Sequence, residues 1–389
     1  MNKILNSLTV LRGLAGNKVI FTLTEYALMD YRNDEKLNDF LSEIYKEGAE
    51  ENLLKYVQTA ILYDINTFST TCAAGKNPSD HLSSAFDKDV NTILKCVNKL
   101  PTHLGFDMGF PIPPFDAPSN SQYAPALCKF YRQNGYGKFI HGKAYKYTDG
   151  GLLPLDCTDS VKLTDLKNYA EQKKAVKNNI LDFISGLPFA NMLLYGDRGT
   201  GKSSTIHAIL NEYSNNGLRL IEVDRDNLES ITKIKQEVAS LPLKFLIFID
   251  DLALNEDDKN ASLLRAAVEG SVVDGGNTMI VATSNRRHII KETSADRDNS
   301  VFLSDVIEEQ LSLSDRFGLT VMFTTTDKED YLSIVMQLAK DYNLNTPTDE
   351  LIRLAERWAI FKGGRSPRKA KQFVQFAYSC EKSNRPIEF

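Results

Sequence analysis

A glycine-rich segment, GDRGTGKSS, begins at Gly196 and contains the residue types that bind phosphate. Its glycines allow the backbone to turn so that successive N–H groups point toward one anion. The lysine can then reach the terminal phosphates of a nucleotide, and the hydroxyl after it can bind magnesium. An apolar run, NMLLYG, leads into the segment and an amphipathic one, SSTIHAILNEY, continues from it, so we expect a strand–loop–helix unit. The residues predicted to bind nucleotide are Gly196, Asp197, Arg198, Gly199, Thr200, Gly201, Lys202, Ser203 and Ser204.

Two aspartates stand at the end of another apolar run. The stretch FLIFIDDLAL begins at Phe245, and Asp250 and Asp251 follow its apolar residues directly. In a parallel sheet the carboxyl ends of the strands share an edge with the phosphate loop. We therefore predict that Asp250 binds Mg²⁺ together with Ser203, and that Asp251 lies beside the attacking water. A solvated loop start is the simpler alternative for two such acids.

An amide and several arginines extend the predicted site. Asn285 follows TMIVATS, where a neutral amide can orient water and contact the γ-phosphate without adding negative charge. Arg316, in SLSDRFGL, precedes the last apolar run, and an arginine from a neighbouring subunit can stabilise a transferring phosphoryl group. Arg365 and Arg368, in GGRSPRKA, open the last helical segment. Each has a simpler interpretation. Asn285 could be an ordinary turn residue, and Arg316 could form a surface ion pair with Asp315. Arg365 and Arg368 could belong to a solvated basic turn.

These residues require an α/β fold to bring them together. Beyond Leu155, short apolar runs alternate with amphipathic segments, which favours a parallel sheet covered by helices on both faces. After Thr325 only helical patterns remain, with Asp327 and Thr348 as predicted N-caps. The predicted strands are 191–196, 218–224, 245–250, 278–284 and 319–323, and the predicted helices are 170–186, 328–342, 348–363 and 366–382.

The chain before the sheet carries no catalytic pattern. In EENLLKYVQTAILYDINTF apolar residues recur at three- and four-residue steps, as in a helix, whereas the segment from Pro101 is crowded with prolines and turn formers. YGKFIHGKAYKYTDGGLLPL has the alternation of a short hairpin. We therefore predict an N-terminal helical domain at 1–100, a Pro-rich linker with a hairpin at 101–155, an α/β nucleotide-binding domain at 156–325 and a helical lid at 326–389.

The composition narrows the classes of function. The 389 residues include 46 basic and 51 acidic ones, and the net charge of -5 gives no sign of general nucleic-acid or membrane-surface binding. The five cysteines form no CxxC and no Cys/His cluster, which argues against a disulfide framework or a zinc site. Arg12 interrupts the N-terminal apolar run, and no run approaches the roughly 20 apolar residues of a membrane span. We expect a cytoplasmic protein.

In this order, the motifs resemble those of AAA+ ATPases. The segments NYAEQKK, GDRGTGKSS, FIDDLAL, ATSNRRHIIKE, LSLSDRFGLTVMF and ERWAIFKGGRSPRKAKQF more closely resemble the bacterial AAA+ group catalogued as domain of unknown function 815. The resemblance covers about residues 135–373. It implies that Lys202, Ser203 and Asp250 bind MgATP, that Asn285 is sensor 1, and that Arg316 is the arginine finger.

The resemblance also assigns the lid side of the site. It implies that Arg368 is sensor 2, because RSPRKA lines up with the arginine-containing start of the AAA+ lid helix, and Arg365 is the second choice. Leu166 and Tyr169 would border the adenine. The implied cofactors are ATP and Mg²⁺.

Most AAA+ proteins have Glu where this chain has Asp251. The shorter side chain withdraws the carboxylate by one C–C bond, about 1.5 Å, and a misplacement of roughly 1 Å can lower a rate about a hundredfold. We therefore expect slow ATP hydrolysis that drives conformational or assembly changes in a protein partner. An ATP-operated switch or loader with little turnover is the alternative. A small-molecule P-loop kinase would leave Asn285 and Arg316 without a role.

The expected partners follow from the same residues. Arg316 implies self-association, since a finger acts on a neighbour's site. The segment VDRDNLESITKIKQEV after the second strand has neither an aromatic residue nor a glycine, which disfavours a protein-threading ring. We expect a protein partner at the N-terminal helices and no membrane. A nucleic-acid partner stays open, through those helices or through the basic cluster Arg286 to His288, which could equally read the nucleotide state.

Overall fold

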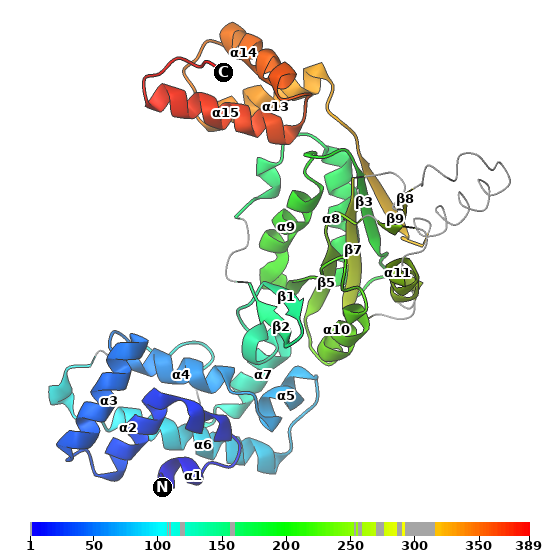
Figure 1. Cartoon of the computed structure of the whole chain (residues 1–389). Coiled ribbons are helices and arrows are strands. Elements are labelled where there is room, and N and C mark those ends of the chain that lie inside the picture. Colours follow the sequence, from blue (N-terminus) through cyan, green and yellow to red (C-terminus); the bar gives the residue numbers. More distant parts are fainter. Residues whose placement is uncertain are drawn as a thin grey trace. The chain divides into compact units, whose positions relative to one another are not determined.

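The structure, a computed structural model, divides the chain into two compact units (Figure 1). The first comprises Met1–Gly142 and Ser240–Leu243, and the second Lys143–Ala239 and Lys244–Phe389. No helix in the described ranges is both long enough and apolar enough to cross a membrane. The residues that the structure describes are 2–106, 108, 110–116, 121–155, 160–252, 254–255, 259–269, 276–285, 290–291 and 316–389.

The regular elements described in the first unit are helices (Figure 1). Asn17, Asn33 and Asn52 each cap one of them, because the side-chain oxygen accepts a backbone N–H of the first turn. The core is rich in aromatic residues, and the rings of Phe68 and Phe86 stack at 4.0 Å. The elements are α1 (Lys3–Asn6), η1 (Arg12–Gly16), α2 (Lys18–Leu28), α3 (Asp34–Glu47), α4 (Leu53–Tyr63), α5 (Thr67–Ala73), α6 (Asp80–Asn98), η2 (Thr102–Leu104), α7 (Ala124–Asn134) and η4 (Gly137–Phe139).

The region predicted as a linker, 101–155, is divided between the two units. Residues up to Gly142 belong to the first unit, where Phe115, Leu127 and Tyr131 are buried in the helical core. The segment includes the eleven-residue helix α7, which has Pro125 in its first turn, and its buried apolar side chains anchor it in that core. The predicted hairpin forms at 144–154 and joins the sheet of the second unit.

A seven-stranded sheet forms the centre of the second unit, with strand order β2-β1-β4-β5-β7-β3-β9. Neighbouring strands pair in parallel except β1 and β2, which are antiparallel. The inner strands β5 and β7 are buried along nearly their whole length, as expected for strands covered on both faces. The strands are β1 (Ala144–Thr148), β2 (Gly151–Pro154), β3 (Met192–Gly196), β4 (Leu218–Glu222), β5 (Lys244–Ile249), β7 (Thr278–Ser284) and β9 (Leu319–Phe323).

Helices cover both faces of this sheet, which confirms the predicted α/β class (Figure 1). On one face, Val176 of α8 and Ile206 of α9 pack with Leu246 and Phe248 of β5 in one core. On the other, α10 buries Ile231, among other apolar residues. The helices are α8 (Ala170–Ile184), α9 (Lys202–Tyr213), α10 (Ser230–Val238) and α11 (Lys259–Glu269), with short elements η5 (Leu163–Asp165), η6 (Ser214–Asn216), β6 (Leu254–Asn255) and β8 (Ile290–Lys291).

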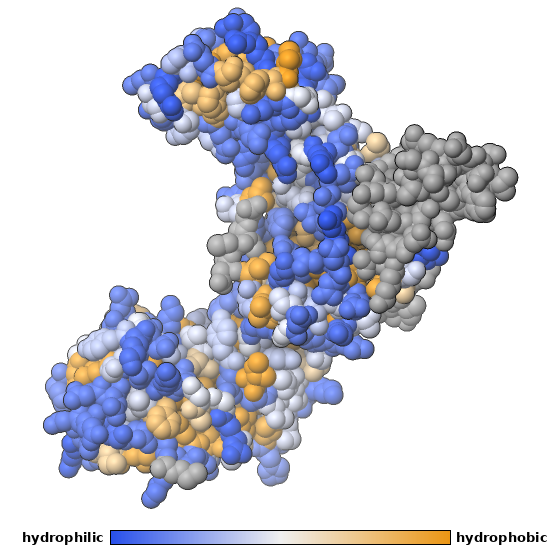
Figure 2. Space-filling view, viewed as in Figure 1, coloured by the Kyte–Doolittle hydropathy of each residue, from blue (hydrophilic) through white to orange (hydrophobic). Residues whose placement is uncertain are grey.

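Three helices, α13 (Lys328–Asp341), α14 (Thr348–Phe361) and α15 (Pro367–Lys382), form the lid. Asp327 caps α13 as predicted, by accepting the N–H of Asp330 at 2.7 Å. Thr348 does not cap α14, because it is already the first helical residue after Pro347. Figure 2 shows apolar side chains gathered on the visible face of the lid. Among the apolar residues of α14, Ile360 and Phe361 are 76% and 64% exposed.

Asp89 in α6 is a buried carboxylate that supports the segment before η1. Its Oδ2 accepts the backbone N–H groups of Thr9, Val10 and Leu11 at 2.8, 2.6 and 3.1 Å, and the residue is 1% exposed. Asp89→Ala would leave three donors without this acceptor, so we expect a loss of about 3 kcal/mol or more in the free energy of unfolding. Urea denaturation followed by circular dichroism checks this, with the exposed Asp80→Ala of the same helix as control. Equal effects of both variants would contradict it.

Candidate nucleotide-binding site

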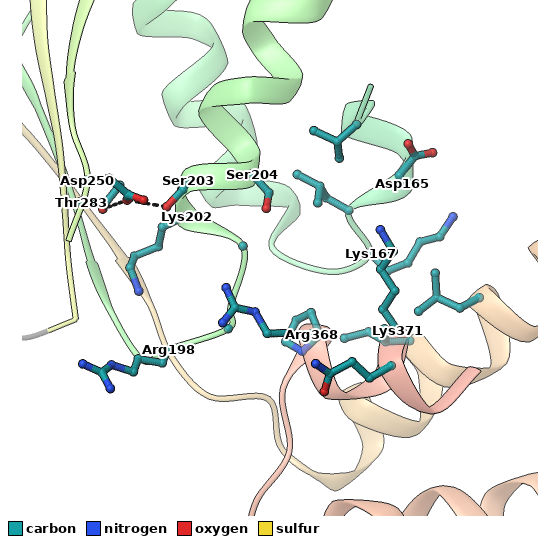
Figure 3. A pocket seen from close by; sticks show the side chains of 18 of the residues that line it. Asp165, Lys167, Arg198, Lys202, Ser203, Ser204, Asp250, Thr283, Arg368 and Lys371 are labelled. Carbon is teal, nitrogen blue, oxygen red and sulfur yellow. Dashed lines mark hydrogen bonds between the residues drawn. The ribbon is translucent and has the colours of Figure 1, made fainter. Parts of the chain in front are cut away.

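A cavity of about 890 Å³ lies where the phosphate loop, the ends of β5 and β7, and the lid come together (Figure 3). The phosphate loop contributes Arg198 and the turn that leads into α9. The lid contributes apolar side chains from α13, Ile334 and Leu338, and polar ones from α15. Its size and its mixture of cationic and apolar walls suit a nucleotide, whose phosphates and base require different surroundings.

Two glycines of the phosphate loop meet specific backbone requirements. Gly196 has a φ of 125°, and a side chain there would collide with the backbone carbonyl of Phe323 on the neighbouring strand. Gly201 has a φ of 97° and immediately precedes α9. Both angles lie in the region that L-residues with side chains rarely adopt. The strand–loop–helix geometry predicted for GDRGTGKSS is therefore present.

Lys202 is a buried ammonium at the start of α9. Its Nζ donates to the carbonyl oxygens of Gly196 at 2.9 Å and Asp197 at 2.8 Å, and to Asn285 Oδ1 at 3.1 Å. Burial lowers the pKa of this lysine, while the carboxylates of Asp197, Asp250 and Asp251 act in the opposite direction. An ammonium held at the cavity wall in this way is placed to meet an anion.

Ser203, Asp250 and Thr283 form a cluster of oxygen atoms beside Lys202 (Figure 3). The hydroxyls of Ser203 and Thr283 both donate to Asp250 Oδ1, at 2.6 and 2.5 Å. Mg²⁺ prefers oxygen ligands and uses one or two protein side chains together with phosphate oxygens and water. The Ser203 hydroxyl and the Asp250 carboxylate fit this ion, and they are the residues that would hold it.

Asp251 and Asn285 lie next to each other at the ends of β5 and β7. The Asn285 side-chain amide donates to Asp251 Oδ1, and the Asp251 backbone N–H donates to the Thr283 hydroxyl at 3.0 Å. Asp251 has a φ of 51°, an uncommon conformation for a residue with a side chain, often found at functional sites. Asn285 thus joins Lys202 and Asp251 in one hydrogen-bond chain.

The two lid arginines have different surroundings. Arg368 lines the cavity in the first turn of α15, and its backbone N–H donates to the Gly199 carbonyl at 3.2 Å. Arg365 forms a two-bond ion pair with Glu356 of α14, at 2.9 and 3.2 Å. This pair lowers the pKa of Glu356, with Lys328 adding to the effect. The geometry therefore favours Arg368 over Arg365 as the lid residue that meets a nucleotide.

Several residues predicted to bind the cofactor do not line the cavity within the described part of the chain. Tyr169 is 8% exposed, its ring packs against Phe323, and its hydroxyl donates to the Thr324 carbonyl at 2.5 Å. Burial raises the pKa of this hydroxyl to about 12. The backbone of Tyr169 is left-handed, with a φ of 58°. Leu166 lines the cavity, whereas Tyr169 is not among the described residues that do.

Two residues of the phosphate loop also turn their side chains elsewhere. Thr200 is buried, and its hydroxyl donates to the Asp197 carbonyl at 2.8 Å. Asp197 is exposed, and its Oδ2 accepts the backbone N–H of Thr325 at 2.8 Å. The Thr200 hydroxyl shapes the loop, and the Asp197 carboxylate connects the loop to the segment after β9. Arg198, Gly199, Ser203 and Ser204 do line the cavity.

Arg316 is not among the described residues that line this chain's cavity. It is half-buried, three residues before β9. Asp315, its ion-pair partner in the simpler interpretation, and the cluster Arg286 to His288 lie outside the described residues.

The sequence prediction missed several residues that line the cavity. Thr283, Lys167 and Lys371 are the polar ones that matter most for its chemistry. Lys371 lies one turn after Arg368 on α15, so helical spacing offered a signal. Lys167 forms an ion pair with Asp341 at 2.8 Å, across 174 residues of sequence, which no local pattern indicates.

Residues 140–380, more than half of the chain, match the family described as "Protein of unknown function (DUF815)". The chain belongs to this family. As a DUF815 protein it has a mostly parallel sheet with a phosphate loop between β3 and α9, followed by a helical lid, which is the α/β class that the sequence predicted.

This DUF815 chain also has more distant similarities to other proteins, one in sequence and two in structure. The chromosomal replication initiator protein DnaA of Streptococcus equi subsp. zooepidemicus is 24% identical over 182 residues, 44% of this chain and 37% of that protein. The chain thus spans little more than a third of this relative's length. The RuvB Holliday junction branch migration motor of Thermotoga maritima aligns with a TM-score of 0.39 and 17% identity, covering 58% of this chain and 66% of that one. The Aeropyrum pernix ORC1 protein in complex with DNA aligns with a TM-score of 0.43 and 14% identity, covering 60% and 64%.

Tyr169→Phe separates an anchoring role from a nucleotide contact. The variant loses the hydroxyl that Thr324 accepts, so we expect about 1 kcal/mol less stability and an unchanged affinity for ATP. Thermal unfolding and calorimetric titration measure the two quantities, with Tyr147→Phe on β1 as control. A large loss of affinity without a loss of stability would restore the prediction that Tyr169 borders the adenine.

Proposed function

We propose that this protein binds MgATP in the cavity and hydrolyses it slowly, and that its nucleotide states drive conformational or assembly changes in a protein partner. The observation that carries this proposal is the meeting of Lys202, the Ser203–Asp250 pair, the Asp251–Asn285 pair and Arg368 around one cavity. They come from the phosphate loop, two neighbouring strands and the lid. A cytoplasmic setting fits the four described cysteines, which are buried free thiols.

In this proposal the chain's own residues hold the phosphates. Lys202 exchanges a protein acceptor for β- and γ-phosphate oxygens, and the N-terminus of α9 adds its positive dipole. Ser203 and Asp250 would hold Mg²⁺, which would neutralise negative charge at those oxygens. Arg368 approaches from the lid, so that closure of the lid over the phosphates completes the cationic surroundings. Leu166, with the apolar side chains of α13, borders the base.

Asp251 is the proposed acceptor for the proton of the attacking water. Asn285 holds this carboxylate by a hydrogen bond and would orient the same water. The short aspartate keeps the carboxylate close to the strand end, which favours slow turnover. The short side chain of Asp251 also favours a second candidate function. This is an ATP-operated switch or loader, in which the ATP-bound state matters and turnover is incidental.

Arg316 is proposed to act on the site of a neighbouring copy, because it does not line the described cavity of its own chain. This requires self-association into a ring or another oligomer. The first unit, whose described regular elements are all helices, is the proposed docking region for the protein partner. A nucleic-acid partner remains the less supported form of the loader alternative.

Mixing two inactive variants tests whether the site is shared. Arg316→Ala should lower turnover roughly a thousandfold while ATP still binds, and Asp251→Asn should also stop turnover. If the finger acts between subunits, mixing the two restores activity, because some interfaces then combine an intact Asp251 with an intact Arg316. The exposed Arg225→Ala serves as control and should retain full activity. Tight ATP binding with no turnover in the wild-type protein at any concentration would favour the switch.

The two lid arginines form a matched pair of variants. Arg368→Ala should weaken ATP binding roughly tenfold and leave thermal stability nearly unchanged. Arg365→Ala should do the reverse, because it removes the partner of Glu356 inside the lid and no residue of the cavity. Isothermal titration measures the ATP affinity of both variants, and thermal unfolding measures their stability. Weaker ATP binding in Arg365→Ala alone would identify Arg365 as sensor 2.

A further inference from the structure

The segment that joins the sheet to the lid is held residue by residue. We call residues 324–326 the hinge segment, since they lie between the end of β9 at Phe323 and the α13 cap Asp327. The Phe323 carbonyl accepts the Asp197 backbone N–H at 3.0 Å, and the Thr325 N–H donates to Asp197 Oδ2 at 2.8 Å. Asp197 therefore holds the strand end and the hinge segment at the same time.

The other side of Asp197 faces the phosphate site. Its carbonyl oxygen accepts the Lys202 ammonium at 2.8 Å and the Thr200 hydroxyl at 2.8 Å. One residue thus contacts the lysine that is placed for phosphate and the backbone that leads to the lid. Asp197 and Thr325 are 128 residues apart in the sequence. Their hydrogen bond is therefore a tertiary contact, and local turn geometry does not account for it.

The hydrogen-bond capacity of Lys202 links the two sides. An ammonium has three hydrogens, and here they meet the carbonyls of Gly196 and Asp197 and the side chain of Asn285. A phosphate oxygen that binds this ammonium must replace at least one of these acceptors. When the Asp197 carbonyl is the one replaced, the peptide loses a strong charge-assisted bond and can rotate. Its carboxylate, joined to Thr325, moves with it.

We propose that Asp197 is a positioning residue that couples phosphate binding at Lys202 to the position of the lid, through its carboxylate bond to the Thr325 N–H. The coupling rests on the proposed function, because it needs a phosphate-bearing nucleotide in the cavity. It assigns Asp197 a task other than the direct nucleotide contact expected from its place in the loop. The path runs through the hinge segment, whereas Arg368 meets the loop separately at Gly199.

A buried polar group supports a second arrangement of the hinge segment. Thr326 is 6% exposed, and its hydroxyl has no hydrogen-bond partner among the described residues. A buried hydroxyl without a partner costs free energy, so a hinge position that supplies one is favoured in this respect. Asp327 caps the N-terminus of α13, so a rotation in the hinge segment would move α13 as a rigid body.

The test compares Asp197→Ala with Asp197→Asn in the full-length protein. The asparagine keeps a side-chain oxygen that can accept the Thr325 N–H, whereas the alanine does not. Glu381→Ala is the matched control, because Glu381 also accepts lid backbone N–H groups, those of Asn345 and Thr346 at 3.1 and 2.8 Å, but inside the lid. Hydrogen–deuterium exchange of the peptide spanning 323–331 is measured with and without MgATP, beside ATP affinity and turnover.

We expect MgATP to slow exchange in 323–331 of the wild-type chain. In Asp197→Ala, exchange without nucleotide should be roughly fivefold faster, and the effect of ATP should be lost. Turnover should fall roughly tenfold while the dissociation constant for ATP changes less than about threefold. Asp197→Asn should restore both the protection and the turnover. Glu381→Ala should leave the effect of ATP on this peptide intact.

Two results would overturn the coupling. One is an effect of ATP on 323–331 that is the same in Asp197→Ala as in the wild type. The other is an equal loss of ATP affinity in both Asp197 variants, which would make the carboxylate a direct nucleotide contact. If the wild-type chain bound no ATP, the proposed function itself would be wrong and the coupling with it, a result distinct from any loss confined to the variants.

Discussion

Lys202 is a buried residue, at 6% exposure, and its ammonium is held by oxygen atoms from the phosphate loop and from the residue after β7. A buried cation is tolerated only where it is paired or fully hydrogen-bonded, so Lys202 needs oxygen acceptors close to it, from the chain or from a bound phosphate. The loop reaches this position because Gly196 passes against the Phe323 carbonyl, where no side chain fits. The phosphate loop, β7 and β9 are thereby held in one arrangement around a single charged group.

The carboxylates of the site are placed by the neighbouring strand more than by their own. Ile249 pairs with Ala282 in the sheet, and Asp250 comes next to Thr283 as a result. The Thr283 hydroxyl donates to the Asp250 carboxylate and accepts the Asp251 N–H. This one side chain therefore fixes both acids, and the parallel register between β5 and β7 is what brings it there.

The lid shows how a short motif can hold two different tasks. Ser366 caps α15 and Pro367 begins it, so Arg365 lies before the helix and Arg368 lies in its first turn. Arg365 turns back to Glu356 and joins α14 to the start of α15, whereas Arg368 faces the cavity. The sequence favoured Arg368 by resemblance, and the ion pair of Arg365 supplies the physical reason. Spacing alone could not separate two arginines so close to a helix start.

The sequence by itself determined the elements that depend on local rules: the glycines of the phosphate loop, the five apolar strands, the acids at a strand end and the lid helices. Glycine conformations, apolar periodicity and capping are set by neighbouring residues, so they can be read from a linear pattern. Only the tertiary structure decided that Tyr169 anchors Thr324, that the Asp197 carboxylate meets Thr325, and that residues 101–142 belong to the helical unit. Each of these three contacts joins residues that are distant in sequence. A carboxylate, an aromatic ring or a proline-rich segment could contact many different partners, and only the folded chain selects one of them.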